Sequence, residues 1–229
     1  MCVLKFLRDC PIPEKELGNN LNLFIKRQQL TRVLFMFELY KKIVPIHGNI
    51  LEFGVRWGQD LVLFESFRGM LEPYNYTRKI IGFDTFQGFP SVTELDLDAQ
   101  VGDMAVTEGY EDYLKVLLHE HELSSPLSQI KKAHLVKGDV IQTLPLYLLE
   151  HPETMISFAY FDLDIYEPTK HCLIHCKDRL LKGAVIGFDE ANNENWPGES
   201  VAIQEVFGIK NIKLQRFEWC PTMSYMVVE

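Results

Sequence analysis

Residues 50–60 read Ile-Leu-Glu-Phe-Gly-Val-Arg-Trp-Gly-Gln-Asp, a short apolar run followed by a loop with two glycines. The apolar run predicts a β-strand over 49–53, and the apolar spacing after the loop predicts a helix over 58–70. Gly54 allows a tight turn and a close approach of the backbone to a ligand. Gly58 stands at the start of the helix, where unpaired N–H groups gather. This strand–loop–helix pattern predicts a site for a nucleotide-like cofactor.

The same loop is a poor match to a dinucleotide site. The dehydrogenase fingerprint Gly-x-Gly-x-x-Gly needs a second glycine two residues after the first, where this chain has Arg56. A nicotinamide-dependent dehydrogenase is therefore a weaker hypothesis than an enzyme that binds another nucleotide-type cofactor.

Strand and helix patterns alternate along the rest of the chain. After the first strand we expect strands over 78–84, 133–136, 155–162 and 184–189, and helices over 110–123, 140–150, 167–181 and 197–206. Because parallel neighbours need a crossover, this alternation indicates a parallel sheet. The last two strands, 211–217 and 224–228, have no room for a crossover helix. The predicted fold class is α/β: a Rossmann-like, mostly parallel seven-stranded sheet with a C-terminal antiparallel hairpin and helices on both faces.

An N-terminal part, residues 1–45, precedes the first strand. Residues 1–19 contain two prolines and a glycine and are expected to form an arm. Residues 20–45 carry Leu, Phe, Lys and Arg at helical spacing, which predicts one long amphipathic helix. We expect this part to act as a lid or as a dimer contact for a main domain over 46–229.

The net charge limits the kinds of binding partner, and the cysteine count indicates the cellular compartment. The formal net charge of −9 disfavours bulk binding to nucleic acid or to an anionic membrane, and no apolar run approaches the ~20 residues of a membrane span. Five cysteines, an odd number without a recognisable signal peptide, favour reduced thiols in the cytoplasm. Cys172 and Cys176 alternate with two histidines, but a structural zinc site wants four ligands together, so helix-face residues are the favoured interpretation.

Acidic residues follow two later strands at the expected cofactor edge. Asp84 ends the second strand and is placed to accept both ribose hydroxyls, as carboxylates do in nucleotide-binding folds. The alternative is a cap of the following turn. Gly138 and Asp139 end the third strand, where an adenine amino group would be met. Asp139 is equally suited to cap the next helix, and one residue can do both.

Three carboxylates end the fourth and fifth strands. Asp162 closes one strand and Asp189 and Glu190 close the next, so parallel pairing brings all three to one edge of the sheet. Like charges this close need a cation or shared protons. Oxygen-only ligands suit a hard divalent ion such as Mg²⁺, which would hold substrate hydroxyls and lower the pKa of one. The alternative is a set of solvated strand-end and helix-cap acids.

Together these motifs resemble the macrocin/mycinamicin O-methyltransferase family over about 50–206. The family's Glu-x-Gly-x-x-x-Gly loop resembles residues 52–58. Its Asp-x-Phe-x-Gly-x-Pro segment resembles residues 84–90, and its Asp-x-Asp-x-Tyr-Glu-x-Thr segment resembles residues 162–169. Its paired-acid metal motif, usually Asp-Asp, is Asp-Glu at 189–190.

The resemblance implies an S-adenosylmethionine-dependent class I methyltransferase that methylates a sugar hydroxyl with the help of Mg²⁺. The expected acceptor is a glycoside or a nucleotide sugar, and a homodimer is allowed for. The cofactor residues implied are Glu52, Gly54, Arg56, Trp57, Gly58, Asp84, Thr85, Phe86, Gly138, Asp139 and Val140. The metal ligands implied are Asp162, Asp189 and Glu190, with Asp162 also the catalytic base. Acceptor contacts are assigned to Asp164, Tyr166 and Trp196. For Trp57 and Trp196, ordinary aromatic packing stays an equal alternative to a ligand contact.

The chain departs from the family after the paired-acid motif. Glu190 replaces the usual second Asp, and residues 191–200 lack the usual tyrosine-containing loop. Together with residues 85–108, which are expected to form a loop, they would shape the acceptor pocket. Two other functions stay open: a non-methylating relative with the same metal rim, such as the cephalosporin hydroxylase-like proteins, and a non-catalytic binding module of the same fold.

Overall fold

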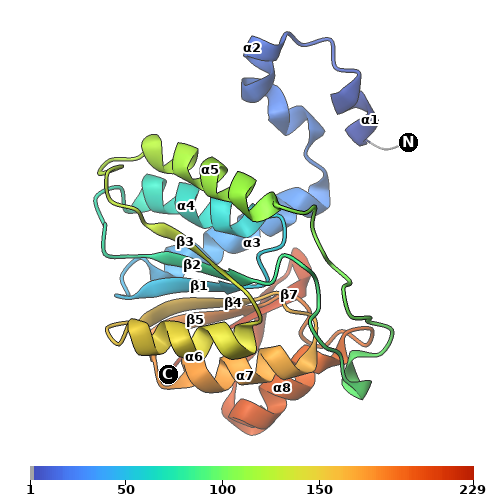
Figure 1. Cartoon of the computed structure of the whole chain (residues 1–229), viewed down its shortest axis with the longest axis vertical. Coiled ribbons are helices and arrows are strands. Elements are labelled where there is room, and N and C mark those ends of the chain that lie inside the picture. The colour runs from blue at the N-terminus through green and yellow to red at the C-terminus, as the bar shows by residue number, and fades with distance from the viewer. Residues whose placement is uncertain (1–2) are drawn as a thin grey trace.

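The chain folds around one seven-stranded sheet (Figure 1). The computed structural model describes residues 3–229, so Cys2 lies outside the described residues. The strand order is β3-β2-β1-β4-β5-β7-β6, in which β1 to β5 are parallel and β7 runs antiparallel to its two neighbours. The strands are β1 (Asn49–Phe53), β2 (Ile80–Asp84), β3 (Ala133–Lys137), β4 (Ile156–Phe161), β5 (Leu180–Phe188), β6 (Gln215–Phe217) and β7 (Cys220–Val227). The predicted fold class is confirmed.

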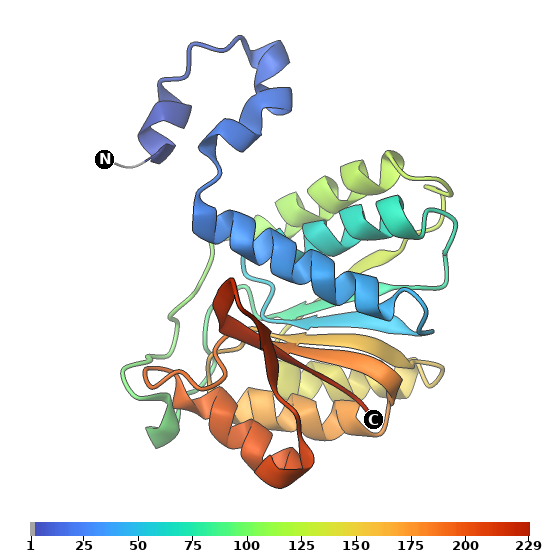
Figure 2. The same cartoon turned by 180° about the vertical axis from the view of Figure 1, so that it is seen from behind.

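Helices cover both faces of the sheet (Figures 1 and 2). One layer consists of α3 (Arg27–Ile43), α4 (Gln59–Leu71) and α5 (Tyr110–Leu123). The other consists of α6 (Val140–Glu150), α7 (Tyr166–Lys177) and α8 (Pro197–Phe207). Because strand side chains alternate between faces, Ile50 of β1 packs in the first layer's core and Leu51 in the second's. A sheet buried on both faces explains why its strands read as continuous apolar runs.

The register of the parallel strands aligns their carboxyl ends. Phe53 of β1 pairs with Phe83 of β2 and with Phe161 of β4, which pairs with Phe188 of β5. The four rings contact one another in series, with centroid distances of 5.3, 4.9 and 5.5 Å. The loops that follow these positions therefore leave the sheet along one edge.

The N-terminal segment differs from the single helix predicted over 20–45. Its elements before α3 are α1 (Val3–Arg8), α2 (Glu14–Leu17) and the 3₁₀ helix η1 (Gly18–Phe24). The helix α3 begins only at Arg27, because asparagines before it compete for backbone hydrogen bonds and disfavour a helix interior. Nδ2 of Asn20 donates to the carbonyl of Glu16 (2.9 Å). The elements before α3 stand apart from the sheet, whereas α3 packs against α4, β5 and β7 (Figure 2).

The boundary between α7 and β5 also differs from the helix predicted over 167–181. The helix ends at Lys177, and the strand begins at Leu180, which pairs with Ile156 of β4. Arg179 fixes this turn, because its guanidinium donates to three backbone carbonyls at the end of α6 and just after it. The apolar pair at 180–181 therefore starts a strand instead of ending the helix.

The C-terminal hairpin is displaced from its predicted bounds. Its first strand covers 215–217 and not 211–217, because the 3₁₀ helix η3 (Ile209–Asn211) and an irregular stretch over 212–214 precede it. Its second strand begins at Cys220, which pairs with Phe217. The ring of Phe217 stacks on that of Trp219 (5.0 Å between centroids), which supports the tight turn between them.

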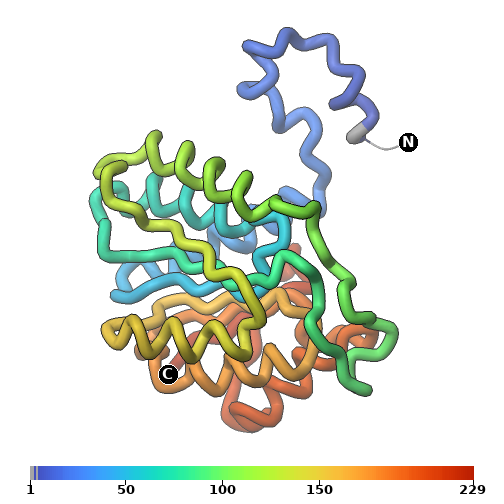
Figure 3. The backbone as a smooth tube through the Cα atoms, viewed as in Figure 1, coloured from blue at the N-terminus to red at the C-terminus, as the bar shows by residue number. Residues whose placement is uncertain are grey.

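The loop between β2 and α5 crosses the carboxyl edge of the sheet. Figure 3 traces it from β2 past this edge to the side of α8 and back to α5. Its 3₁₀ turn η2 (Glu94–Asp96) contacts α8. Asp96, only 1% exposed, accepts the backbone N–H of Tyr166 at the start of α7 (2.7 Å). The loop is thus fixed at one side of the functional edge.

Two further expectations concern membranes and thiols. Across the described residues, no helix has the length and apolar character that crossing a bilayer requires. Cys172 and Cys176 lie on the buried face of α7, fully covered by the core, and burial raises the pKa of both thiols. Their placement agrees with the interpretation of this run as helix-face residues.

Candidate active site

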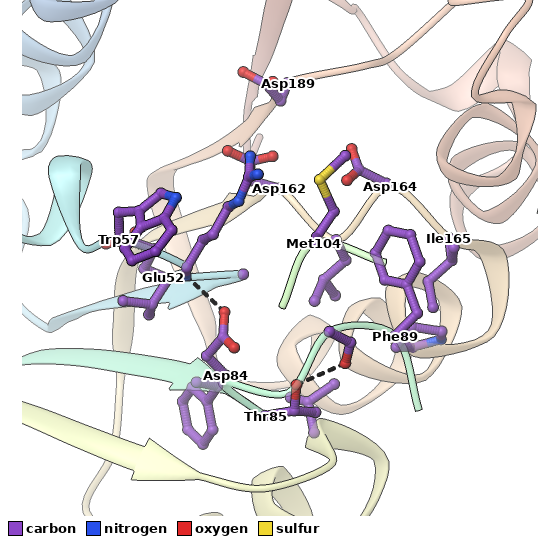
Figure 4. A pocket seen from close by; sticks show the side chains of 18 of the residues that line it. Glu52, Trp57, Asp84, Thr85, Phe89, Met104, Asp162, Asp164, Ile165 and Asp189 are labelled. Atoms are coloured by element: carbon purple, nitrogen blue, oxygen red, sulfur yellow. Dashed lines mark hydrogen bonds between the residues drawn. The ribbon is translucent and has the colours of Figure 1, made fainter. Parts of the chain in front are cut away.

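A cavity of about 390 Å³ opens at the carboxyl edge of the sheet (Figure 4). Thirteen of the residues predicted from the sequence line it: Glu52, Gly54, Arg56, Trp57, Asp84, Thr85, Gly138, Asp139, Val140, Asp162, Asp164, Asp189 and Glu190. Figure 4 shows Asp162, Asp164 and Asp189 on one side of the cavity, and Asp84 with Thr85 on the other. The separate sequence motifs therefore meet in one place.

The glycine loop after β1 lies directly against the end of β4. Gly54 has a φ of +90°, and a Cβ atom there would lie 1.8 Å from the carbonyl oxygen of Asp162. Gly58 caps α4 in the left-handed conformation, and a Cβ there would lie 2.5 Å from the side chain of Leu114. Gly58 sets the start of α4 and does not line the cavity. Gly54 is the residue that permits the close approach of loop and strand.

Glu52 lines the cavity and is only 1% exposed. Its Oε2 atom has no hydrogen-bond partner among the described residues. Burial, and then the nearby carboxylates of Asp60 and Asp162, raise the pKa of Glu52 well above its ordinary value. A buried oxygen without a partner is costly, so this atom is a natural binding point for a donor on a ligand.

Asp84 ties the glycine loop to β2. Its Oδ2 accepts the backbone N–H of Arg56 (2.7 Å), and its Oδ1 accepts that of Phe86 (2.5 Å). The second bond is the turn cap that the sequence left as an alternative to ribose binding. A carboxylate offers about four lone-pair sites, so Asp84 keeps acceptor capacity toward the cavity. Phe86 is buried at 5% exposure and does not line it.

The end of β3 is hydrogen-bonded to the end of β2 at the cavity. The N–H of Gly138 donates to the carbonyl of Asp84 (2.9 Å). Oδ1 of Asp139 accepts the N–H of Ile141 (3.0 Å) and so caps α6. Asp139 and Val140 also line the cavity, so the capping role leaves a ligand contact open.

Arg32 of α3 joins the carboxylates on the other side of the cavity. Its Nε and Nη2 donate to Oδ2 of Asp60 (3.0 and 2.6 Å). Nη2 also donates to Oδ2 of Asp162 (2.5 Å), and Nη1 donates to Oδ1 of Asp189 (2.7 Å). The hydroxyl of Tyr160 donates to the same Asp189 oxygen (2.7 Å). One guanidinium therefore connects three acids.

Sequence reasoning missed both Arg32 and Asp60. Asp60 is the last residue of the glycine motif and forms part of the first turn of α4, so its position was a usable signal. Arg32 is separated from Asp162 and Asp189 by 130 and 157 residues and has no local signature. Only the packing of α3 on the sheet brings it to this edge.

Asp162, Asp164, Asp189 and Glu190 form a carboxylate rim at this edge of the cavity. Its other two members, Asp164 and Glu190, make fewer bonds to cationic groups. Burial, then Glu190 and Asp189, raise the pKa of Asp164 to about 6. The Glu190 carboxylate accepts a bond from Nδ2 of Asn193, within its own loop. The backbone N–H of Glu190 donates to Oε1 of the buried Glu199 (3.1 Å). Glu190 is therefore fixed through its backbone, while its carboxylate binds a side chain of its own loop.

The rim fits a divalent cation in charge and in donor chemistry. Asp162 and Asp189 each present one oxygen to a single cationic group, the guanidinium of Arg32. These donors are hard carboxylate oxygens, which suit Mg²⁺. In the part of the chain that the structure describes, no three His, Cys, Asp or Glu side chains are already grouped to hold a metal ion. Arg32 lies between two of the predicted ligands, Asp162 and Asp189, while Glu190 binds Asn193.

Two residues assigned to the acceptor do not line the cavity. The hydroxyl of Tyr166 donates to Oε2 of Glu205 on α8 (2.6 Å), so this side chain faces α8. Trp196 packs against Phe89, with ring centroids 6.3 Å apart, in a small apolar cluster that includes Ile165. Phe89 and Ile165 do line the cavity, so Trp196 supports that wall from behind.

Comparisons with known proteins identify the family to which the chain is similar. Residues 30–213 match the family model described as macrocin O-methyltransferase. The chain is 44% identical to the calicheamicin methyltransferase CalS11, with a TM-score of 0.96 over 98% of this chain and 89% of that one. An apo structure of CalS11, described as a TDP-rhamnose 3′-O-methyltransferase of calicheamicin biosynthesis, gives 42% identity and a TM-score of 0.88 over 98% and 90%. The O-methyltransferase NovP shares the fold, with 18% identity and a TM-score of 0.66 over 86% and 79%. A search of curated proteins gives no match.

Proposed function

Because this chain belongs to the macrocin O-methyltransferase family and is an S-adenosylmethionine-dependent methyltransferase, we propose that it methylates a hydroxyl of a sugar. The observation that carries this proposal is the convergence of the glycine loop and the carboxylate rim in one cavity. The 42% identity to a TDP-rhamnose 3′-O-methyltransferase favours a nucleotide sugar over a finished glycoside as the acceptor.

The order of the strands supports a layout for the cofactor. S-adenosylmethionine supplies the methyl group from its sulfonium. We assign its amino-acid end to the loop after β1, where the unpartnered Oε2 of Glu52 can accept ammonium hydrogens. The ribose is assigned to Asp84 after β2, and the adenine to Asp139 and Val140 after β3. These strands are neighbours in that order, and β4 lies on the other side of β1. The methyl group is thereby directed toward Asp162.

Asp162, Asp189 and Glu190 are the residues that would hold a magnesium ion. When bound, such an ion orients the acceptor oxygens and lowers the pKa of the reacting hydroxyl. Asp162 is the proposed acceptor of that hydroxyl's proton. Burial and then Asp189 raise its pKa well above the ordinary value, against the opposing effect of Arg32. This shift applies before an ion is bound, because a cation on the carboxylate lowers its pKa.

The acceptor sugar is assigned to the side of the cavity between Asp164 and the apolar wall of Phe89 and Ile165 (Figure 4). Asp164 offers an acceptor for a sugar hydroxyl, and the wall offers a surface for the C–H face of the ring. Phe89 belongs to the loop between β2 and α5, so that loop is proposed to determine which sugar is accepted.

The test is methyl transfer from ¹³C-methyl-labelled S-adenosylmethionine, followed by NMR, with TDP-rhamnose and a rhamnosyl glycoside as acceptors. We expect an O-methylated sugar, and a loss of rate of about 10²–10⁴-fold for Asp162→Asn with unchanged affinity for S-adenosylhomocysteine. The matched control is Asp178→Asn, an exposed acid at the end of α7 that should keep the full rate. Full activity of the Asp162 variant would refute its role as base. A chain that binds the cofactor but methylates no sugar would refute the sugar assignment.

A further inference from the structure

Arg32 reaches the acids at the cavity edge from α3, a helix that contributes no other residue to the cavity lining. We propose that Arg32 is an internal cation that competes with the divalent ion for Asp162 and Asp189 and must release both before the ion binds. The proposal rests on the magnesium part of the proposed function, because it concerns the same two carboxylates.

The contacts show why the two cations exclude one another. Nη2 of Arg32 lies 2.5 Å from Oδ2 of Asp162, and Nη1 lies 2.7 Å from Oδ1 of Asp189. Both nitrogens belong to one rigid, planar guanidinium, so the two oxygens are turned toward the same positive centre. A metal ion bound between these oxygens would take the position that the guanidinium occupies and would lie beside a like charge. The guanidinium therefore has to move away when the ion binds.

Asp60 makes this movement feasible. It accepts from both Nε and Nη2 of Arg32 (3.0 and 2.6 Å), and its side chain is only 4% exposed. When Arg32 releases the two rim acids, it keeps this charged partner and is not left as an unpaired buried cation, which would be costly. Asp60 thus serves as the point on which Arg32 is held in both arrangements.

Charge balance explains why a second cation is still attracted. Arg32 brings one positive charge, whereas Asp60, Asp162 and Asp189 alone bring three carboxyl groups. A doubly charged ion would compensate these acids better, so the rim is suited to exchange one cation for the other.

The test is the affinity for Mn²⁺, measured without cofactor or acceptor by the loss of the free-ion signal in electron paramagnetic resonance. If the ion-competent arrangement is a minor population of 1–10%, removing the competing arginine should tighten binding by about 10- to 100-fold. We therefore expect Arg32→Met to bind Mn²⁺ at least about tenfold more tightly than the unaltered chain. Arg27→Met is the matched control, because Arg27 is exposed at the start of the same helix, and its affinity should be unchanged.

A second variant covers the risk that Arg32→Met leaves Asp60 buried without its partner. Arg32→Met combined with Asp60→Asn removes both charges and should show the same tighter binding, with circular dichroism confirming a folded chain. Unchanged or weaker Mn²⁺ binding by both folded variants, with clear binding by the unaltered chain, would overturn the role of Arg32 and leave the magnesium proposal standing. No binding by any of the chains, including the unaltered one, would overturn both.

Discussion

Replacing Gly54 by alanine should separate the cofactor loop from the end of β4. The added Cβ would lie 1.8 Å from the carbonyl oxygen of Asp162, whereas ordinary contact begins at 3.4 Å. The atom it meets belongs to the backbone and cannot swing aside as a flexible side chain would. Either the loop or the strand end has to shift.

The expected loss of stability follows from two terms. A non-glycine residue at a φ of +90° costs about 1–2 kcal/mol. The shift also strains two hydrogen bonds at this junction, from the N–H of Gly54 to Phe83 (3.0 Å) and from the N–H of Asp162 to Phe53 (2.9 Å). Each of these hydrogen bonds contributes about 0.5–1.5 kcal/mol. Added to the backbone strain, they predict a loss of stability of about 2–5 kcal/mol. For a chain of this size that lowers Tm by roughly 4–20 °C.

Urea denaturation measures the loss of stability, and calorimetry with S-adenosylhomocysteine measures the loss of cofactor affinity. Gly102→Ala is the matched control, because Gly102 has nearly the same φ, +89°, but open space where its Cβ would stand. The control should lose only the stability due to backbone strain, about 1–2 kcal/mol, and keep its affinity for S-adenosylhomocysteine. Gly54→Ala should bind S-adenosylhomocysteine more weakly, because the shift displaces the loop that is assigned to the cofactor. Equal losses of stability in the two variants, or unchanged affinity in Gly54→Ala, would refute the reasoning.

Further predictions concern Asp84 and Asp164. Asp84→Asn replaces an oxygen that accepts from Arg56 or Phe86 by an NH₂ donor, so we expect calorimetry to show about tenfold weaker binding of S-adenosylhomocysteine; an unchanged affinity would contradict the assignment of the ribose to this residue. Asp164 has a pKa of about 6 against an ordinary 3.8, so it binds its proton more tightly in the folded chain. Its contribution to stability is full below about pH 4 and is lost as the pH rises through 6. Urea denaturation between pH 4 and 7 should therefore show a flatter profile for Asp164→Asn than for the unaltered chain, and parallel profiles would speak against this origin.

The features that the sequence predicted share a physical basis. Gly54 and the acids at 84, 139, 162 and 189 all follow apolar strands, and parallel pairing brings such positions to one edge whatever the details of packing. The strand order was not needed to expect that Asp162 and Asp189 lie near each other. This is why the cavity contains most of the predicted residues although they come from distant segments.

The features that the sequence missed depend on tertiary packing. Arg32 carries no periodic signal, and its role exists only because α3 lies beside β5 and β7. Tyr166 was assigned to the acceptor as part of the motif over 162–169, but the first turn of α7 directs its side chain toward α8. The break before Arg27 was hidden because apolar residues continue at near-helical spacing through a segment that the asparagines turn into a 3₁₀ helix.

Asp162 is the point at which the cofactor loop and the cation rim meet. Its backbone oxygen would contact any Cβ at Gly54, and its backbone N–H donates to Phe53 at the end of β1. Its side chain binds Arg32. A displacement of the glycine loop must therefore move the proposed base and alter its contact with the guanidinium. The cofactor and the divalent ion therefore act on the same residue from opposite sides. Binding of the cofactor should change the affinity for the ion by the same factor as binding of the ion changes the affinity for the cofactor.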